Sequence, residues 1–256
     1  MKARALGRRP PTRPTRRVPS HGVRVFSFHL AELGVGPVVR TLWSPPTSAN
    51  VAGLHHAECL FPMRLGASLL SPWRWQVRRL AMFGAWESET AIDDFLGSPG
   101  LGRAMAAGWH VRLRFLRRWG HLRALDGLAA SAGETDLDAP VVAVTIARVA
   151  FPQVPRFLHW GKPVERLVRD HPGATLALAA ARPWRTISTF SVWRSAREML
   201  GMVHGTSAVA DPQRHAVAMA ERRRKDFHVE FTTLRFAPTG EHGTWEGRQA
   251  IVPIQL

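Results

Sequence analysis

Two stretches of this sequence share one pattern: Phe83-Gly-Ala-Trp86-Glu-Ser-Glu-Thr-Ala-Ile-Asp-Asp-Phe95 and Phe190-Ser-Val-Trp193-Arg-Ser-Ala-Arg-Glu-Met-Leu-Gly-Met202. In each, a Phe-x-x-Trp motif ends a run of the kind found in β-strands. A serine two residues later is then placed to cap a following helix. The recurrence predicts that the chain contains the same structural unit twice.

The later unit shows the order of its elements most clearly. Its patterns predict strands over 141–149, 174–181, 185–193 and 228–237, and helices over 155–170, 195–203 and 212–225. This βαββαβ order is that of a ferredoxin-like unit. Two such units can pack sheet against sheet and so bury the face that each leaves open. The predicted fold is therefore α+β, with two ferredoxin-like βαββαβ repeats that form an internal dimeric α+β barrel.

The earlier unit is expected to match the later one beyond the Phe-x-x-Trp motifs. It begins with a predicted strand over 23–30, and its stretch from Trp109 to Leu113 aligns with the stretch from Phe227 to Phe231. Residues 126–140 are small, polar and acidic, unlike the segments on either side. The predicted organisation is a disordered basic tail over 1–19, repeat 1 over 20–125, a linker over 126–140 and repeat 2 over 141–256.

The formal net charge of +16 would suit a nucleic-acid-binding protein. However, all but three of the 35 basic residues are arginines and tyrosine is absent, which indicates a general compositional bias. Seven of the positive charges lie in the first 17 residues, which hold no acid. This tail is expected to be an inert solvated segment or a tether to anionic lipid. Because the sequence holds no recognised motif that reads nucleic acid, binding of nucleic acid is the last of the functions considered.

Cys59 is the only cysteine, which excludes an intrachain disulfide and fits a reducing cytoplasm. No uninterrupted apolar stretch reaches the roughly 18 residues that a spanning helix needs. The expected location is cytoplasmic, with peripheral contact to a membrane through the basic tail as an added expectation.

A series of motifs in the second repeat carries a family resemblance. In order along the chain they are Thr189-Phe-Ser-Val-Trp193, a predicted helix with Met199, His215-Ala-Val-Ala-Met219, the stretch from Phe227 to Phe236, and Gly243-Thr-Trp-Glu-Gly-Arg248. This order resembles that of the spheroidene monooxygenase family. Where the family tends to carry a Gly-x-Gly-Glu stretch, this chain has Leu178-Ala-Ala-Ala-Arg-Pro183. The resemblance implies an oxygenase that acts on a carotenoid or another apolar molecule, with haem as cofactor and an electron donor as partner.

A haem implied by this resemblance needs an axial ligand, and without tyrosine the choices are histidine, methionine or Cys59. His215 is the first candidate, because Met219 and Arg222 share its predicted helix face and Arg222 suits a propionate. His204 is the second candidate. His215 is equally well explained as a surface residue of a basic helix, and the alternative for His204 is that it is a turn residue.

Aromatic residues are the candidates for lining a substrate pocket. They are Trp86 and Trp193, with Phe190 and Ser191 beside the latter, and Trp245 in a glycine turn that is expected to close the barrel end. The alternative for the paired tryptophans is that each anchors the core of its repeat. A tetrahedral zinc site at His55-His-Ala-Glu-Cys59 lacks a second ligand cluster. A barrel that binds haem or lipid without catalysis is the alternative function.

Overall fold

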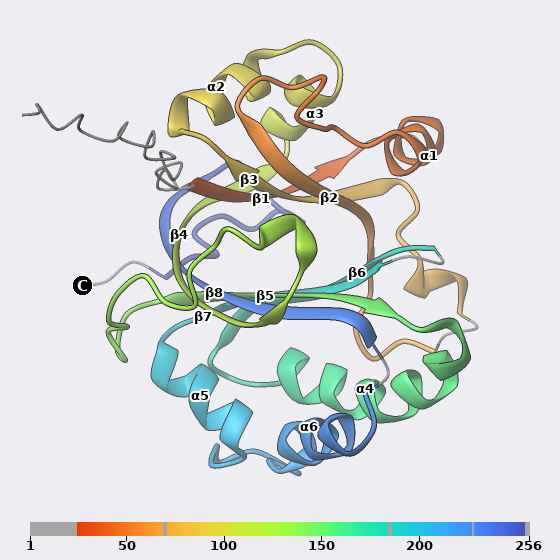
Figure 1. Cartoon of the computed structure of the whole chain (residues 1–256), viewed down its shortest axis with the longest axis vertical. Helices are drawn as coiled ribbons and strands as arrows, with labels where there is room; N and C mark the ends of the chain where they lie inside the picture. Colours follow the sequence, from red (N-terminus) through yellow and green to blue (C-terminus); the bar gives the residue numbers. More distant parts are fainter. Residues whose placement is uncertain (1–24, 69–70, 184–185, 227, 254–256) are drawn as a thin grey trace, which may run out of the picture.

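Two equivalent half-barrels make up the chain. The computed structural model describes residues 25–253 apart from 69, 70, 184, 185 and 227, so the predicted tail over 1–19 lies outside the described residues. In each half, four antiparallel strands carry helices on one face, and Figure 1 shows the two helical layers on opposite sides of the molecule. The predicted α+β fold is confirmed.

The first half follows the ferredoxin-like order. Its elements are β1 (Val25–Glu32), α1 (Val35–Trp43), β2 (Leu54–Met63), η1 (Pro72–Arg74), β3 (Arg79–Trp86), α2 (Glu89–Gly97), α3 (Leu101–Ala106), β4 (Trp109–His121) and η2 (Arg123–Leu125). After a stretch without helices or named strands over 126–140, the second half repeats the order. It consists of β5 (Val141–Val149), η3 (Phe151–Gln153), α4 (Val154–Arg169), β6 (Ala174–Arg182), β7 (Thr186–Trp193), α5 (Ala196–His204), α6 (Arg214–Arg224) and β8 (His228–His242).

The strands close into one barrel in the order β1-β3-β2-β6-β7-β5-β8-β4. The halves join along β4 and β8, and again where Phe61 to Met63 of β2 face Ala181 to Ala179 of β6. All of these pairs are antiparallel. The barrel is therefore continuous across both repeats, and its interior is shared between them.

The two Phe-x-x-Trp motifs occupy equivalent positions, as predicted. Trp86 faces Val25 across β1 and β3, and Trp193 faces Val141 across β5 and β7. The serines that follow are N-caps in both halves, because Ser88 Oγ accepts from the Ala91 amide and Ser195 Oγ accepts from the Glu198 amide, each at 3.2 Å. The repeat is thus reproduced at the level of single hydrogen bonds.

The alignment of Trp109 with Phe227 is wrong. Leu30 faces Trp109 in the first half, and its equivalent in the second half, Ile146, faces Thr232. Trp109 therefore corresponds to Thr232. The sequence alignment matched an aromatic-His-Val pattern, and it placed the inward Val111 opposite Val229, which is 74% exposed.

The barrel interior is filled with aromatic and aliphatic side chains. The rings of Phe28 and Phe190, one from each half, stack with their centroids 3.7 Å apart. Phe26 and Phe83 from the first half pack against Phe236 from the second. Both halves contribute to this shared interior. They differ instead in the layers between the sheet and the helices that cover it.

Candidate functional site

The outer face of the first half-sheet is sealed by its own side chains. One row across four strands consists of Cys59, Met82, His29 and His110, which are neighbours in the strand register. The first three are 0% exposed and His110 is 6% exposed. These side chains fill the layer between the sheet and the helices of repeat 1.

The equivalent row in the second half is made of smaller side chains. It consists of Ala179, Thr189, Thr145 and Thr233, paired in the same register. Thr189 is exposed although β7 is hydrogen-bonded on both edges, while Thr145 and Thr233 are half-buried with their Oγ1 atoms 3.1 Å apart. A threonine at the middle of a barrel strand is solvent-accessible only when nothing packs on it. Ala179 is 2% exposed and packs with the helix-facing core of the first half. We call the surface formed by Thr189, Thr145 and Thr233 the open face.

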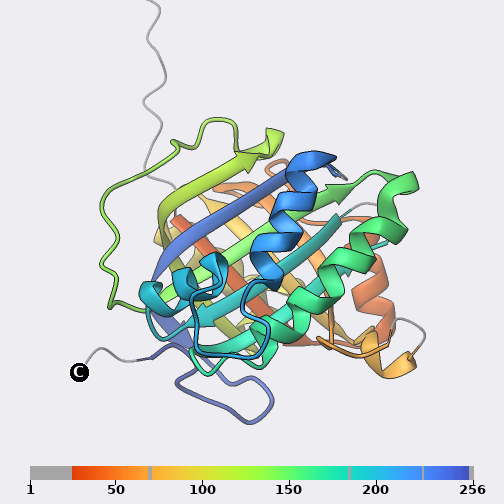
Figure 2. The same cartoon turned by 90° about the horizontal axis from the view of Figure 1, so that it is seen from below.

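Helices α4, α5 and α6 lie across the open face, as Figure 2 shows from below. α6 packs against α4 and α5. Arg156 on α4 ties the two longer helices together through Glu221 on α6, with a shortest N to O distance of 2.6 Å. The helices are thus held to one another, and the small side chains beneath them leave the open face accessible.

The inner stripe of α6 consists of His215, Ala218, Met219 and Arg222, which are buried or half-buried and spaced as one helix face. Arg222 reaches the sheet, because its guanidinium lies 3.6 Å from the ring centroid of Phe231. Phe231 precedes Thr233 by two residues on β8 and therefore shares its side of the sheet. The predicted face of α6 thus points toward the open face.

His215 is oriented by a backbone carbonyl. Its Nδ1 lies 3.1 Å from the carbonyl oxygen of Val203 at the end of α5. A carbonyl only accepts, so Nδ1 carries the proton and the lone pair is on Nε2. Burial lowers the pKa of His215, although the bond to Val203 opposes this, and nearby His204 lowers it further. The imidazole is therefore neutral at neutral pH and presents Nε2 in the form that binds a metal.

His204 differs from His215 in its exposure to solvent and in the lack, among the described residues, of a hydrogen bond that would orient its ring. It ends α5, it is exposed, and its ring makes no hydrogen bond within the described part of the chain. Nothing there orients its ring. The two candidate ligands lie in the same corner of repeat 2, and only His215 belongs to the inner stripe.

A hollow lies beside the start of α6. Its volume is about 690 Å³, and its walls come from α4 and the segment that leads into α6. Basic side chains on these walls are Lys162, Arg166 and Arg214, and Arg214 directly precedes His215. A second hollow of about 440 Å³ shares Pro163 and Arg214 with the first and adds the apolar surfaces of Trp160 and Val217. The walls of the two hollows thus combine apolar side chains with basic ones and with two carboxylates, Asp170 and Asp211, of which Asp211 pairs with Arg214.

The paired tryptophans lie in the helix-facing cores of the two halves, and both are 0% exposed. Each indole donates to a hydroxyl: Trp86 Nε1 to Ser27 Oγ at 2.7 Å, and Trp193 Nε1 to Ser191 Oγ at 2.8 Å. In this structure their rings adjoin protein on all sides. Ser191 is itself buried, with 8% exposure.

Phe190 and Trp245, the other two predicted pocket residues, belong to the core inside the barrel. Phe190 stacks on Phe28, and Trp245 packs at one end of the interior with the guanidinium of Arg79 4.8 Å from its ring centroid. The residues proposed from sequence as one pocket are therefore divided between the barrel interior and the layers beneath the helices.

An ionic cluster inside the other end of the barrel was not found from sequence. Glu58 is 1% exposed and lies 3.1 Å from His56, 2.9 Å from Arg148 and 3.5 Å from Arg182. Burial raises the pKa of Glu58, but the hydrogen bond from His56 and the two guanidiniums hold it below its usual value. Arg148 also pairs with Glu230 on β8 at 2.5 Å. The sequence could have predicted this cluster, because these charged residues stand at positions of their strands where the alternation of side chains points inward.

Within the described residues, no group of three or more His, Cys, Asp or Glu side chains is arranged to hold a metal ion. In the stretch considered for zinc, Cys59 belongs to the buried outer row, whereas Glu58 takes part in the ionic cluster inside the barrel. Nor is any helix in the described part of the chain long and apolar enough to cross a membrane.

Comparison with known proteins shows the fold. No protein-family model and no curated protein matches the sequence. The aldoxime dehydratase OxdRE, solved in complex with butyraldoxime, matches with a TM-score of 0.53 and 8% identity over 84% of this chain and 79% of that one. A second aldoxime dehydratase matches with a TM-score of 0.48 and 10% identity over 87% and 88% of the two chains. A candidate monooxygenase from Fusobacterium nucleatum gives 0.37 and 9% over 87% and 95%. The chain has the dimeric α+β barrel fold, and at these identities the likeness extends no further.

Proposed function

We propose that this protein binds haem between the open face and helix α6, with His215 Nε2 as axial ligand, and that it is an oxygenase of an apolar, carotenoid-like substrate. The observation that carries the proposal is the hydrogen bond from His215 Nδ1 to the Val203 carbonyl. A histidine held in this way has a fixed ring and tautomer, as metal-binding histidines usually do.

Three further features suit a haem. Thr189 is exposed and Thr145 and Thr233 are half-buried, whereas the matching residues of repeat 1 are all buried. Met219, one turn from His215, adds an apolar contact. Lys162 and Arg166 beside the hollow have no ion pair among the described residues and can pair with propionates. Arg214 already pairs with Asp211, and Arg222 stacks on Phe231 and pairs with Asp226 at 3.5 Å.

Bound haem would supply the activation of dioxygen that an oxygenase needs, with electrons from a donor. The chain's own residues would hold and neutralise the macrocycle and exclude water from its buried edge. The apolar substrate class rests on the resemblance to spheroidene monooxygenases together with the apolar lining by Trp160 and Val217.

Haemin titration of the purified protein tests the ligand. Wild-type protein is expected to develop a shifted Soret band, and His215→Ala should lose it or bind at least about tenfold more weakly. His204→Ala is the matched control, since it removes a neighbouring but exposed histidine, and it should bind as wild type does. Unchanged binding by His215→Ala, or no binding by wild type, would contradict the proposal.

Thr189→Met tests the location independently, because methionine occupies the equivalent position 82 of the sealed row. The added side chain should fill the open face and weaken haemin binding by about tenfold, while the melting temperature stays level or rises. Thr239→Met, at an exposed position of β8, is the control. Equal haemin affinity in Thr189→Met and wild type would place the haem elsewhere. Haem binding without oxygenation of any carotenoid in the presence of a reductant would favour a non-catalytic binding protein.

A further inference from the structure

Helix α1 exposes an apolar stripe to solvent. Val35, Val39 and Trp43 follow one another at intervals of four residues, so they share one face of the helix. Their exposed fractions are 47%, 53% and 90%, and Val38 is the one fully buried residue of the helix. A surface helix ordinarily turns its apolar stripe inward. On α1, apolar side chains point outward as well.

A second apolar group lies beside α1, in the segment around η1. Trp73 is 78% exposed and Val77 is 44% exposed. The amide of Leu33, just before α1, donates to the carbonyl of Arg78 at 2.7 Å, which holds the two segments together. Figures 1 and 2 both place α1 and η1 along the same side of the molecule. We call the surface formed by Val35, Val39, Trp43, Trp73 and Val77 the α1–η1 flank.

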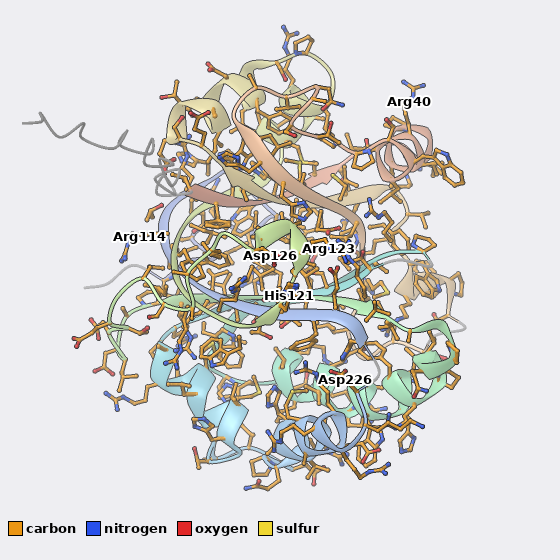
Figure 3. The ribbon with its side chains drawn as sticks, in the orientation of Figure 1. Arg40, Arg114, His121, Arg123, Asp126 and Asp226 are labelled. Carbon is orange, nitrogen blue, oxygen red and sulfur yellow. The ribbon has the colours of Figure 1, made fainter. Side chains whose placement is uncertain are left out.

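Three exposed arginines accompany this flank. Arg40 lies on α1 and extends away from the body of the protein in Figure 3, Arg64 is hydrogen-bonded through its amide to the carbonyl of Arg74 in η1, and Arg78 follows Val77. In the described part of the chain none of the three is within ion-pair distance of an acid. Elsewhere on the surface, arginines such as Arg112 and Arg197 are paired. The flank thus combines exposed tryptophans with uncompensated positive charge.

We propose that the α1–η1 flank docks onto the surface of an anionic lipid bilayer. Tryptophan favours the boundary between headgroups and acyl chains, because its ring is apolar and its N–H remains hydrogen-bonded. Aliphatic side chains beside it add burial of apolar area, and arginines around it are attracted to anionic headgroups. A bilayer meets all three requirements at once. The proposal does not depend on haem binding.

The basic tail and this flank would act as two signals on one membrane. Stable peripheral binding generally needs more than one weak contact. Docking of the flank would explain why its tryptophans are exposed, whereas a purely electrostatic tether would not. Variants of the full-length protein can separate the two contributions, because the tail stays intact when the flank is changed.

Vesicle flotation of the full-length protein tests the proposal. Wild type should float with vesicles that contain phosphatidylglycerol and bind pure phosphatidylcholine vesicles far more weakly. Trp43→Ser/Trp73→Ser should weaken binding to the anionic vesicles by about tenfold or more. Arg40→Glu/Arg78→Glu should do the same and reduce the salt dependence.

Two matched controls identify the surface. Val229→Ser changes a valine that is 74% exposed on β8, and it is paired with Val39→Ser on α1. Arg114→Glu reverses an exposed charge on the opposite side of the molecule from Arg40 (Figure 3), and it is paired with Arg40→Glu. Both controls should bind vesicles as wild type does, and all variants should keep the wild-type circular dichroism spectrum.

Three outcomes would overturn the proposal. One is wild-type protein that does not float with anionic vesicles. Another is flank variants that float as well as wild type, while full-length protein with glutamines in place of Arg8, Arg9, Arg16 and Arg17 does not. The third is equal losses in the flank variants and in their matched controls, which would indicate attraction by net charge alone.

Discussion

Lowering the pH from 6.5 to 5 is expected to reduce the free energy of unfolding by about 3 kcal/mol through His29 and His110, the two histidines of the buried outer row of the first half. Burial lowers the pKa of His29 to about 3, with further lowering by His110 and Arg112. Burial also lowers the pKa of His110 to about 4, with additional lowering by His242 and Arg112 against an opposing effect of Asp93. Both rings therefore stay neutral in the folded protein.

The sign follows from the unfolded chain, where histidine titrates near 6.5. Above this pH neither state binds the protons, and the stability is fully present. Below this pH the unfolded chain binds protons that the buried rings of the folded protein do not bind. The free energy of unfolding therefore falls by up to about 1.4 kcal/mol per pH unit for each histidine. Carboxylates such as Glu58 and Glu221, whose pKa values are lowered, act only at lower pH. The window from 6.5 to 5 thus belongs to histidines.

Urea denaturation at a series of pH values measures this slope. His29→Leu/His110→Leu should flatten it markedly, because leucine does not titrate and the Nδ1 atoms that it replaces have no hydrogen-bond partner among the described residues. His55→Gln, at an exposed position, is the control and should keep the wild-type slope. The remaining slope would come from His171, His215 and His228, whose pKa values burial also lowers. An unchanged slope in the double variant would contradict the prediction.

Local patterns were enough to predict the fold. The two Phe-x-x-Trp motifs, each followed by a capping serine, are short-range features, and short-range features are readable from a single sequence. They identified β3 and β7 as equivalent strands of the two repeats, and α2 and α5 as equivalent helices. The strand patterns then supplied the βαββαβ order. The limits over 1–19, 20–125, 126–140 and 141–256 remain predictions of domain organisation.

The long-range features were harder to predict. The match of Trp109 to Phe227 failed because an alternating strand looks alike at several registers, and only pairing with β1 or β5 decides between them. The division of Trp86, Trp193 and Phe190 between different layers also depends on which face each strand turns inward. His215 could be selected from sequence, but the carbonyl that orients it belongs to α5 and becomes adjacent only on folding.

The open face could have been inferred once the repeats were aligned. Thr189 stands where the first repeat has Met82, and the same offset of the Phe-x-x-Trp motifs relates them. A smaller residue at a matched position indicates space where its counterpart has packing. Comparing the repeats with each other is therefore more informative than reading either one alone.

Phe190→Ala is expected to destabilise the whole protein by about 3–5 kcal/mol, because it empties the centre of the shared interior. Phe190 is 1% exposed, stacks on Phe28 of the other half at 3.7 Å and meets the ring of Trp109 edge-on at 6.0 Å. Phe28 and Trp109 are themselves buried, so the cavity that alanine leaves stays inside the core. Phe231→Ala, which removes a half-buried ring outside the sheet, is the control and should cost less.

The pair also tests whether the halves fold as one. Phe28 and Phe190 are in direct contact, so the loss of unfolding free energy in Phe28→Ala/Phe190→Ala should fall short of the sum of the single losses by about 0.5–3 kcal/mol. Denaturation followed by tryptophan fluorescence and by circular dichroism should give one coincident transition in wild type, because the core crosses the boundary between the repeats. Additive single losses together with two separate transitions would mean that each half keeps its own core, and that the ring stack across the barrel contributes little to stability.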